Sequence, residues 1–127
     1  MIKYIIDAFS WIEYLEGSET GKKVYEILNS DAENYALLVT ISEVVSKVKR
    51  NGGNIELAFD SIVSNCKVAN ITTKIAKEAG LLHAEIRKKM PQFSIVDSLL
   101  ITTAKNIGAK VLTGDNHFKQ FKEAVLL

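Results

Sequence analysis

Short apolar segments rich in β-branched residues alternate along this chain with longer segments whose apolar residues recur at helical spacing. The short segments suit buried strands, and the alternation is typical of βα units around a mainly parallel sheet. Parallel strands need crossover connections, which the intervening helices can provide. The sequence therefore predicts an α/β fold, a three-layer α/β/α sandwich around a mainly parallel sheet of four or five strands.

The individual elements are predicted from apolar spacing and from glycine and proline boundaries. Strands are expected at residues 3–6, 35–41, 67–71 and 110–113, with a small edge strand at 124–127. Helical segments are expected between Asp7 and the break at Gly17, and then at residues 22–29, 42–50, 55–63, 73–89, 95–107 and 116–122. The helix at 95–107 is apolar on most of its circumference, so we expect it to be central and buried.

Composition excludes several classes of protein. The 127 residues have the size of one domain, so we expect a single domain over residues 1–127, and the net charge of +1 points to no particular partner. The one cysteine, Cys66, has no partner for an internal disulfide and is expected to be a structural thiol in a reducing cytoplasm. No apolar run is long enough to cross a bilayer, and we expect no signal peptide.

Four acidic residues are predicted to lie at one edge of the sheet. Asp7 directly follows the first strand, Glu43 follows the second, and Asp115 follows the fourth after Thr113-Gly114. Asp97 lies in the first turn of the central helix. Ligands of open α/β sheets bind beyond the carboxyl ends of the strands, which is where these acids fall.

Each acid also has a purely structural interpretation as a helix cap. The segments Thr40–Glu43 and Ser94–Asp97 both match a capping box, in which a hydroxyl and an acid bind free helix N–H groups. Asp7 and Asp115 could cap the helical segments that follow them. Taken one at a time, each acid is explained somewhat better by capping than by function.

Taken together, the four carboxylates favour a metal site. Like charges brought close together repel one another, and a bound cation removes that cost. Carboxylate oxygens and water suit Mg²⁺ or Mn²⁺ rather than soft metals. Such a centre polarises a phosphoryl oxygen and activates water, so the expected substrate is a phosphodiester or phosphate ester.

The same residues resemble the PIN-domain family, and more narrowly the VapC-type toxins, over essentially the whole chain. The resemblance rests on Ile5–Ser10, on Thr40–Glu43, on Ile95–Leu100 and on Val111–Phe118, in this order and at these spacings. It implies a metal-dependent endoribonuclease, often a homodimer, that is inhibited by a small antitoxin protein.

The resemblance also implies roles for particular residues. The acidic quartet of the family corresponds to Asp7, Glu43, Asp97 and Asp115, and these would bind one or two Mg²⁺ or Mn²⁺ ions. Ser10 and Thr113 correspond to hydroxyl positions that support the metal site. Many relatives have a further acid two residues after the fourth, where this chain has His117, so a fifth acidic ligand is not expected.

Candidate binding surfaces lie close to the acids in the sequence. Lys47 and Arg50 follow Glu43 on its helix, and Arg87 and Lys88 precede the loop before Asp97; either pair could bind RNA phosphates or form an ordinary solvated helix face. Trp11 and Tyr14 are candidates for antitoxin binding, with base stacking or a place in the core as the alternatives.

Three other functions are weaker fits. A signalling receiver domain needs an aspartate after the third strand and a lysine after the last core strand, and neither is present. A catalytically silent module that only binds RNA or protein would be expected to have lost one or more of the four acids. A DNA-directed nuclease usually has large insertions, for which 127 residues leave little room.

Overall fold

The computed structural model describes residues 1–127 and contains one sheet of five parallel strands. Along the sheet the strands follow the order β3-β2-β1-β4-β5, so the first strand of the chain lies in the middle. The strands are β1 (Lys3–Ile6), β2 (Glu33–Ala36), β3 (Lys67–Val68), β4 (Lys110–Thr113) and β5 (Ala124–Leu126). The predicted α/β class with a parallel sheet is confirmed, with five strands.

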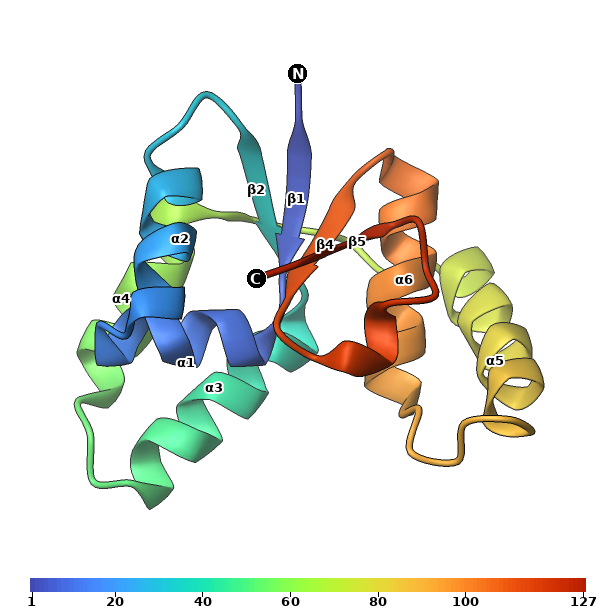
Figure 1. The fold of residues 1–127 in the computed structure, drawn as a ribbon. Helices are drawn as coiled ribbons and strands as arrows, with labels where there is room; N and C mark the ends of the chain where they lie inside the picture. The colour runs from blue at the N-terminus through green and yellow to red at the C-terminus, as the bar shows by residue number, and fades with distance from the viewer.

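Six α-helices and one 3₁₀ turn connect these strands. The α-helices are α1 (Ala8–Glu16), α2 (Glu19–Leu28), α3 (Leu38–Arg50), α4 (Ile55–Asn65), α5 (Thr73–Arg87) and α6 (Ile95–Ile107), and the 3₁₀ turn is η1 (Asn116–Phe118). Figure 1 shows α1 to α4 on one side of the sheet and α5 and α6 on the other. The chain therefore forms the predicted three-layer sandwich.

Each face of the sheet has its own hydrophobic core. Successive residues of a strand point to opposite faces, so Ile5 and Val111 enter the core beneath α5 and α6, whereas Ile6 and Leu112 enter the core beneath α1 to α4. All four side chains are completely buried. Burial on both faces explains why these strands are continuously apolar in the sequence rather than alternating.

The second strand differs from the prediction in a way that matters for the site. The sequence predicts a strand over residues 35–41, but β2 ends at Ala36 and α3 begins at Leu38. A short apolar run does not distinguish a strand from a buried helical turn. Pairing decides the boundary, because Lys3, Tyr4 and Ile5 of β1 lie opposite the three residues that start at Glu33.

This shift also makes the predicted capping box at Thr40–Glu43 wrong. The residue at the start of α3 is Leu37, whose side chain cannot accept a hydrogen bond, and Thr40 lies within the helix with a buried hydroxyl. Glu43 therefore lies in the second turn of α3 rather than at its start. Its side chain is free of any capping role.

Other boundaries differ by smaller amounts. The edge strand β3 is shorter than predicted, α5 ends two residues early, and the last helical segment is only the 3₁₀ turn η1. The helix α6 and strand β4 have the predicted limits, and Gly108 ends α6 with a left-handed backbone (φ 70°) that favours glycine. Cys66 packs against the core beneath α1 to α4, and its burial raises the pKa of the thiol to about 12, as expected of a structural cysteine.

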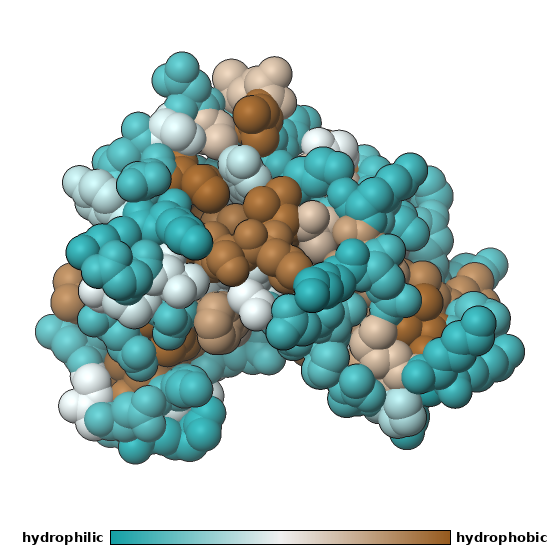
Figure 2. Space-filling model, viewed as in Figure 1, coloured by the Kyte–Doolittle hydropathy of each residue, from teal (hydrophilic) through white to brown (hydrophobic).

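The surface facing the viewer in Figure 2 has two polar helical lobes separated by a notch at the lower edge. In Figure 1 the carboxyl ends of β1 and β4 point towards that edge. No helix has the length and apolar character needed to cross a membrane.

Candidate metal and phosphodiester site

The four predicted acids line a single cavity, here called the acidic cavity, of about 550 Å³. Because β1 and β4 are parallel neighbours, the residues that follow them, Asp7 and Asp115, emerge side by side. Asp97 comes from the start of α6, and Glu43 from the second turn of α3. Four segments that are distant in the sequence thus contribute one carboxylate each.

Asp7 is the most buried of the four, with 6% of its surface exposed. It caps α1, because its Oδ1 accepts a hydrogen bond of 2.8 Å from the backbone N–H of Ser10. Burial raises the pKa of Asp7, the negative charge of Asp115 adds to the rise, and hydrogen bonding by Thr113 and Ser10 opposes it. In the absence of a cation, the folded protein therefore disfavours the ionised form of this carboxyl group.

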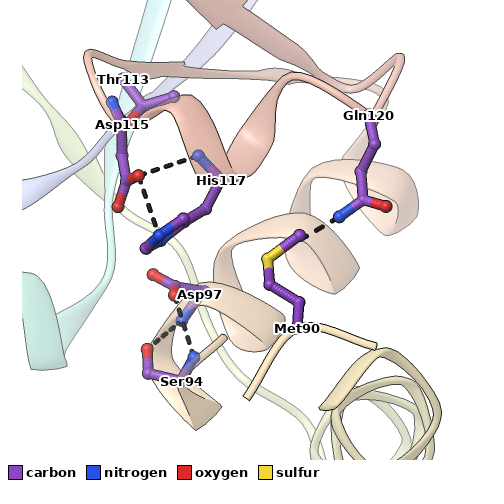
Figure 3. A network of polar contacts seen from close by, with 7 residues as sticks. All are labelled: Met90, Ser94, Asp97, Thr113, Asp115, His117 and Gln120. Carbon is purple, nitrogen blue, oxygen red and sulfur yellow. Dashed lines mark hydrogen bonds and ion pairs between the residues drawn. The ribbon is translucent and has the colours of Figure 1, made fainter. Parts of the chain in front are cut away.

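Asp97 belongs to a complete capping box at the start of α6. The Ser94 N–H donates to Asp97 Oδ2 at 2.9 Å, and the Asp97 N–H donates to Ser94 Oγ at 3.0 Å (Figure 3). The predicted box at Ser94–Asp97 is thus present. These bonds engage one carboxylate oxygen and fix the side chain at the mouth of the cavity.

Asp115 is held by a second local network. Its backbone N–H donates to Thr113 Oγ1 at 3.0 Å, and its Oδ1 accepts from the backbone N–H of His117 at 2.9 Å. The His117 ring lies over the same oxygen, with Nδ1 at 3.1 Å, and occupies the space between the carboxylates of Asp115 and Asp97 (Figure 3). His117 also lines the acidic cavity.

Glu43 differs from the three aspartates because it makes no hydrogen bond within the protein and is exposed. Desolvation raises the pKa of Glu43, and the negative charges of Asp97 and Asp7 raise it further. The long-range charge effects come from two acids of the same cavity. Glu43 is therefore electrostatically linked to the rest of the quartet.

Capping and ligand binding are compatible at this site. The hydrogen bonds of Asp97 and Asp115 each engage one carboxylate oxygen and leave the other for a ligand. The caps also restrict the rotation of both side chains before anything binds. The two interpretations offered by the sequence therefore apply to the same residues at the same time.

The donor set fits a hard divalent cation. Four carboxylates converge, and no lysine or arginine lines the acidic cavity to balance their charge. In this structure no three acidic, histidine or cysteine side chains lie close enough together to hold a metal ion, so binding by three or more of the acids requires their carboxylates to move closer. Oxygen donors of this kind suit Mg²⁺ or Mn²⁺.

The two predicted supporting residues are completely buried beneath the acids. Ser10 Oγ donates to the carbonyl of Leu112 at 2.9 Å, which ties α1 to the end of β4. Thr113 Oγ1 accepts from the backbone of Asp115 and lies beside Asp7. Both hydroxyls therefore help to position Asp7 and Asp115 relative to each other.

A second cavity adjoins the first and has the opposite charge. It has a volume of about 490 Å³, is lined by Lys47 and Arg50, and is here called the basic cavity. The two cavities share Ala8, Phe9 and Glu43. The structure thus brings Lys47 and Arg50 next to the acids.

The other predicted basic pair is not brought to the site. Arg87 and Lys88 are exposed at the end of α5 and line neither cavity. Lys88 instead forms an exposed ion pair of 3.2 Å with Glu85. The alternative of an ordinary solvated helix face describes these two residues better.

Trp11, a candidate for antitoxin binding, lies in the core instead. Its side chain is completely buried in the core beneath α1 to α4, so it can neither stack on a base nor contact a partner. Tyr14 remains partly exposed and packs edge-on against Trp11, with 5.7 Å between the ring centroids. Trp11 lies on the apolar inner face of α1, among the residues of that core.

The exposed aromatic residue next to the acids is Phe9, which is not among the site residues predicted from the sequence. Two residues before a buried tryptophan on a helix, a side chain points away from the core. The two-residue spacing from Trp11 could therefore have indicated from the sequence that Phe9 is exposed. The Phe9 ring lies directly against Gly114, which the sequence places only as a link between Thr113 and Asp115.

Comparison with known proteins identifies the family and the fold. A family model described as PIN domain matches residues 4–124. No curated protein matches the sequence. The solved structures that the chain resembles include a toxin–antitoxin complex from Klebsiella pneumoniae, with 20% identity, a TM-score of 0.76 and coverage of 96% of this chain and 95% of the other.

Two further structures have similar folds. VapBC2 from Rickettsia felis, bound to a DNA fragment from its promoter, has 15% identity, a TM-score of 0.76 and coverage of 99% and 98% of the two chains. The Mycobacterium tuberculosis toxin VapC20, which cleaves the sarcin-ricin loop, has 16% identity, a TM-score of 0.68 and coverage of 94% and 97%. The likeness extends over nearly the whole of each chain.

Proposed function

Because the chain belongs to the PIN-domain family, we propose that it is a metal-dependent endoribonuclease that hydrolyses RNA phosphodiester bonds. In this proposal residues 1–127 act as a single PIN-like domain and form the toxin of a VapBC-type toxin–antitoxin pair. The observation that carries the proposal is that four carboxylates line one cavity without a lysine or arginine to balance their charge. Such a cavity repels phosphate unless a divalent metal is bound.

The acids divide into two roles in this proposal. Asp7, Asp97 and Asp115 are held by caps and would bind Mg²⁺ or Mn²⁺. Glu43, whose side chain makes no capping hydrogen bond, would contribute a further ligand or orient the attacking water. When bound, the metal supplies polarisation of a phosphoryl oxygen and activation of water. Lys47 and Arg50, in the adjoining cavity, would bind a neighbouring phosphate of the RNA.

The proposed partners are a small antitoxin protein and a second copy of this chain. Several of the solved structures with this fold are toxin–antitoxin complexes, which supports an antitoxin for this chain as well. Partly exposed Tyr14 remains the candidate contact on α1. Growth arrest on expression of the chain, relieved by co-expression of its antitoxin, would test the first partner, and sedimentation of the purified chain would test the second.

The central test is RNA cleavage by the purified protein in Mg²⁺, in Mn²⁺ and in EDTA. We expect cleavage that requires metal and falls by about two orders of magnitude or more in Asp97→Asn, since even residues that only orient metal ligands are worth about 10- to 100-fold. Asparagine can still accept the Ser94 hydrogen bond, so the start of α6 is retained.

The matched control is Asp60→Asn, which changes an exposed acid on α4 outside both cavities. It should cleave as fast as the unaltered protein. Equal cleavage by Asp97→Asn and the unaltered protein would contradict the proposed site. Absence of cleavage of any cellular RNA, together with absence of metal binding by calorimetry, would favour a catalytically silent binding module instead.

A further inference from the structure

Phe9 is an exposed aromatic side chain at the boundary between the acidic and basic cavities. It belongs to the first turn of α1, two residues after Asp7, and 45% of its surface is exposed. It lines both cavities, together with Ala8 and Glu43. Several other apolar side chains are equally exposed, so exposure alone does not single out Phe9. Its position between the two cavities does.

The ring is held in place despite its exposure. A Cβ atom added at Gly114 would lie 2.1 Å from Cε1 of Phe9, well inside van der Waals contact. The ring therefore packs directly against Gly114 in the loop that carries Asp115, and in this position of the ring a larger residue at Gly114 would clash with it. One side of Phe9 is fixed by this contact while the rest remains accessible.

The charges on either side of Phe9 differ in sign. The acidic cavity contains the proposed metal ligands, which would engage one phosphate through a divalent ion. The basic cavity presents Lys47 and Arg50, which suit a second phosphate. An apolar surface between two phosphate-binding positions matches a nucleic-acid strand, in which bases alternate with phosphates.

We propose that Phe9 is a stacking platform for an RNA base adjacent to the scissile phosphate. The inference rests on the proposed nuclease function and adds the residue that positions the substrate strand. Bases of single-stranded RNA stack on exposed aromatic side chains, and this contact tolerates any base because each has a flat π-face. Phe9 therefore positions the strand with little discrimination between sequences.

The test uses short single-stranded RNAs with a mapped cleavage position and a single base removed on either side of it. Cleavage rates are compared for the unaltered protein, Phe9→Ala and Phe9→Leu. Leucine keeps the apolar contact with Gly114 but lacks an aromatic face. In the unaltered protein, loss of the stacked base should lower kcat/KM by about tenfold or more, since stacking on an aromatic ring is worth about 5- to 150-fold per base.

In both variants the same missing base should change kcat/KM by less than about twofold, because the contact is already gone. A second readout precedes catalysis: on rapid mixing in Mg²⁺, 2-aminopurine at that position should lose fluorescence with the unaltered protein before cleavage occurs, but not with Phe9→Ala. The matched control is Phe59→Ala, which removes a phenylalanine of similar exposure, 40%, on α4 outside both cavities.

Two results would overturn the stacking proposal while leaving the nuclease intact. One is a base dependence in Phe9→Leu as large as in the unaltered protein. The other concerns the fold-decrease in kcat/KM from the unaltered protein to Phe9→Ala. If this decrease were the same for intact RNA and for RNA that lacks the base, Phe9 would only support the Asp115 loop. Absence of metal-dependent cleavage by the unaltered protein would overturn the proposed function and this inference together.

Discussion

Asp7 shows how one residue can serve the fold and the site in opposite ways. Its carboxylate caps α1, which stabilises the helix, yet its burial and the nearby charge of Asp115 raise its pKa. A raised pKa in the folded state means that ionisation costs more there than in the unfolded chain. Ionised Asp7 therefore lowers the stability of the metal-free protein.

We expect Asp7→Asn to stabilise the metal-free protein at neutral pH. Asparagine caps helices as well as aspartate does, and it cannot ionise. The stability that protonated Asp7 provides is fully present below the unfolded pKa, near 3.8, and is lost as pH rises through the higher folded value. The advantage of Asp7→Asn should therefore be small near pH 4 and increase towards pH 7.5.

Urea unfolding in EDTA at several pH values would measure this difference in the free energy of unfolding. Asp60→Asn on the surface of α4 serves as the control and should show no such increase with pH. If Asp7→Asn were less stable than the unaltered protein at pH 7.5 without metal, burial of the charge would not be the dominant effect.

At the scale of elements, the site depends on how helix starts are positioned against the ends of strands. The starts of α1 and α6 and the turn η1 each place a capping aspartate at the acidic cavity. Helix α1 packs against α2, and the two helices are in closest contact at Gly21 of α2. A Cβ at Gly21 would lie 2.1 Å from the backbone carbonyl of Glu13 in α1.

We expect Gly21→Ala to destabilise the protein by about 1–3 kcal/mol, as overpacking of a closely packed contact does. The clash is with backbone, so α1 must shift, and Asp7 at its start would shift with it. RNA cleavage should therefore fall together with the free energy of unfolding, which urea titration measures.

The matched control for this prediction is Gly80→Ala. Gly80 also lies within a helix, α5, but a Cβ there would meet no atom within 4 Å. Alanine should stabilise this position by about 0.5–1 kcal/mol through its higher helix propensity. Similar effects at both glycines would show that helix propensity, and not the contact between α1 and α2, governs Gly21.

At the scale of the whole molecule, the acidic cavity joins the two helical layers. Glu43 comes from the layer of α1 to α4, Asp97 comes from α6 on the other face, and Asp7 and Asp115 come from the sheet between them. The mutual repulsion of these charges acts between the layers. A cation bound by all of them would therefore stabilise the assembled fold and not one element.

We expect Mg²⁺ or Mn²⁺ to raise the thermal unfolding midpoint of the unaltered protein by several degrees. A ligand that binds only the folded state stabilises it by about 2.7 kcal/mol at a concentration of 100 times Kd. Differential scanning calorimetry with and without metal measures the shift, which should be much smaller in Asp97→Asn and unchanged in Asp60→Asn. An equal shift in Asp97→Asn would place the metal elsewhere on the protein.

The sequence by itself determined the fold class, because continuously apolar strands and helical spacing leave a parallel sheet between two helical layers as the consistent solution. It also identified the four acids, since Asp7 and Asp115 follow strands whose ends were visible in the apolar pattern. The capping box at Ser94–Asp97 was predictable because it depends only on local geometry.

Tertiary structure decided what local patterns could not. The end of β2 depends on its pairing with β1, so the residues after Ala36 became helix although they are apolar and β-branched. The burial of Trp11 and the exposure of Phe9 depend on which face of α1 meets the sheet. The juxtaposition of Phe9 with Gly114, and of the acidic cavity with Lys47, joins segments far apart in the chain, which only the packing of the elements brings together.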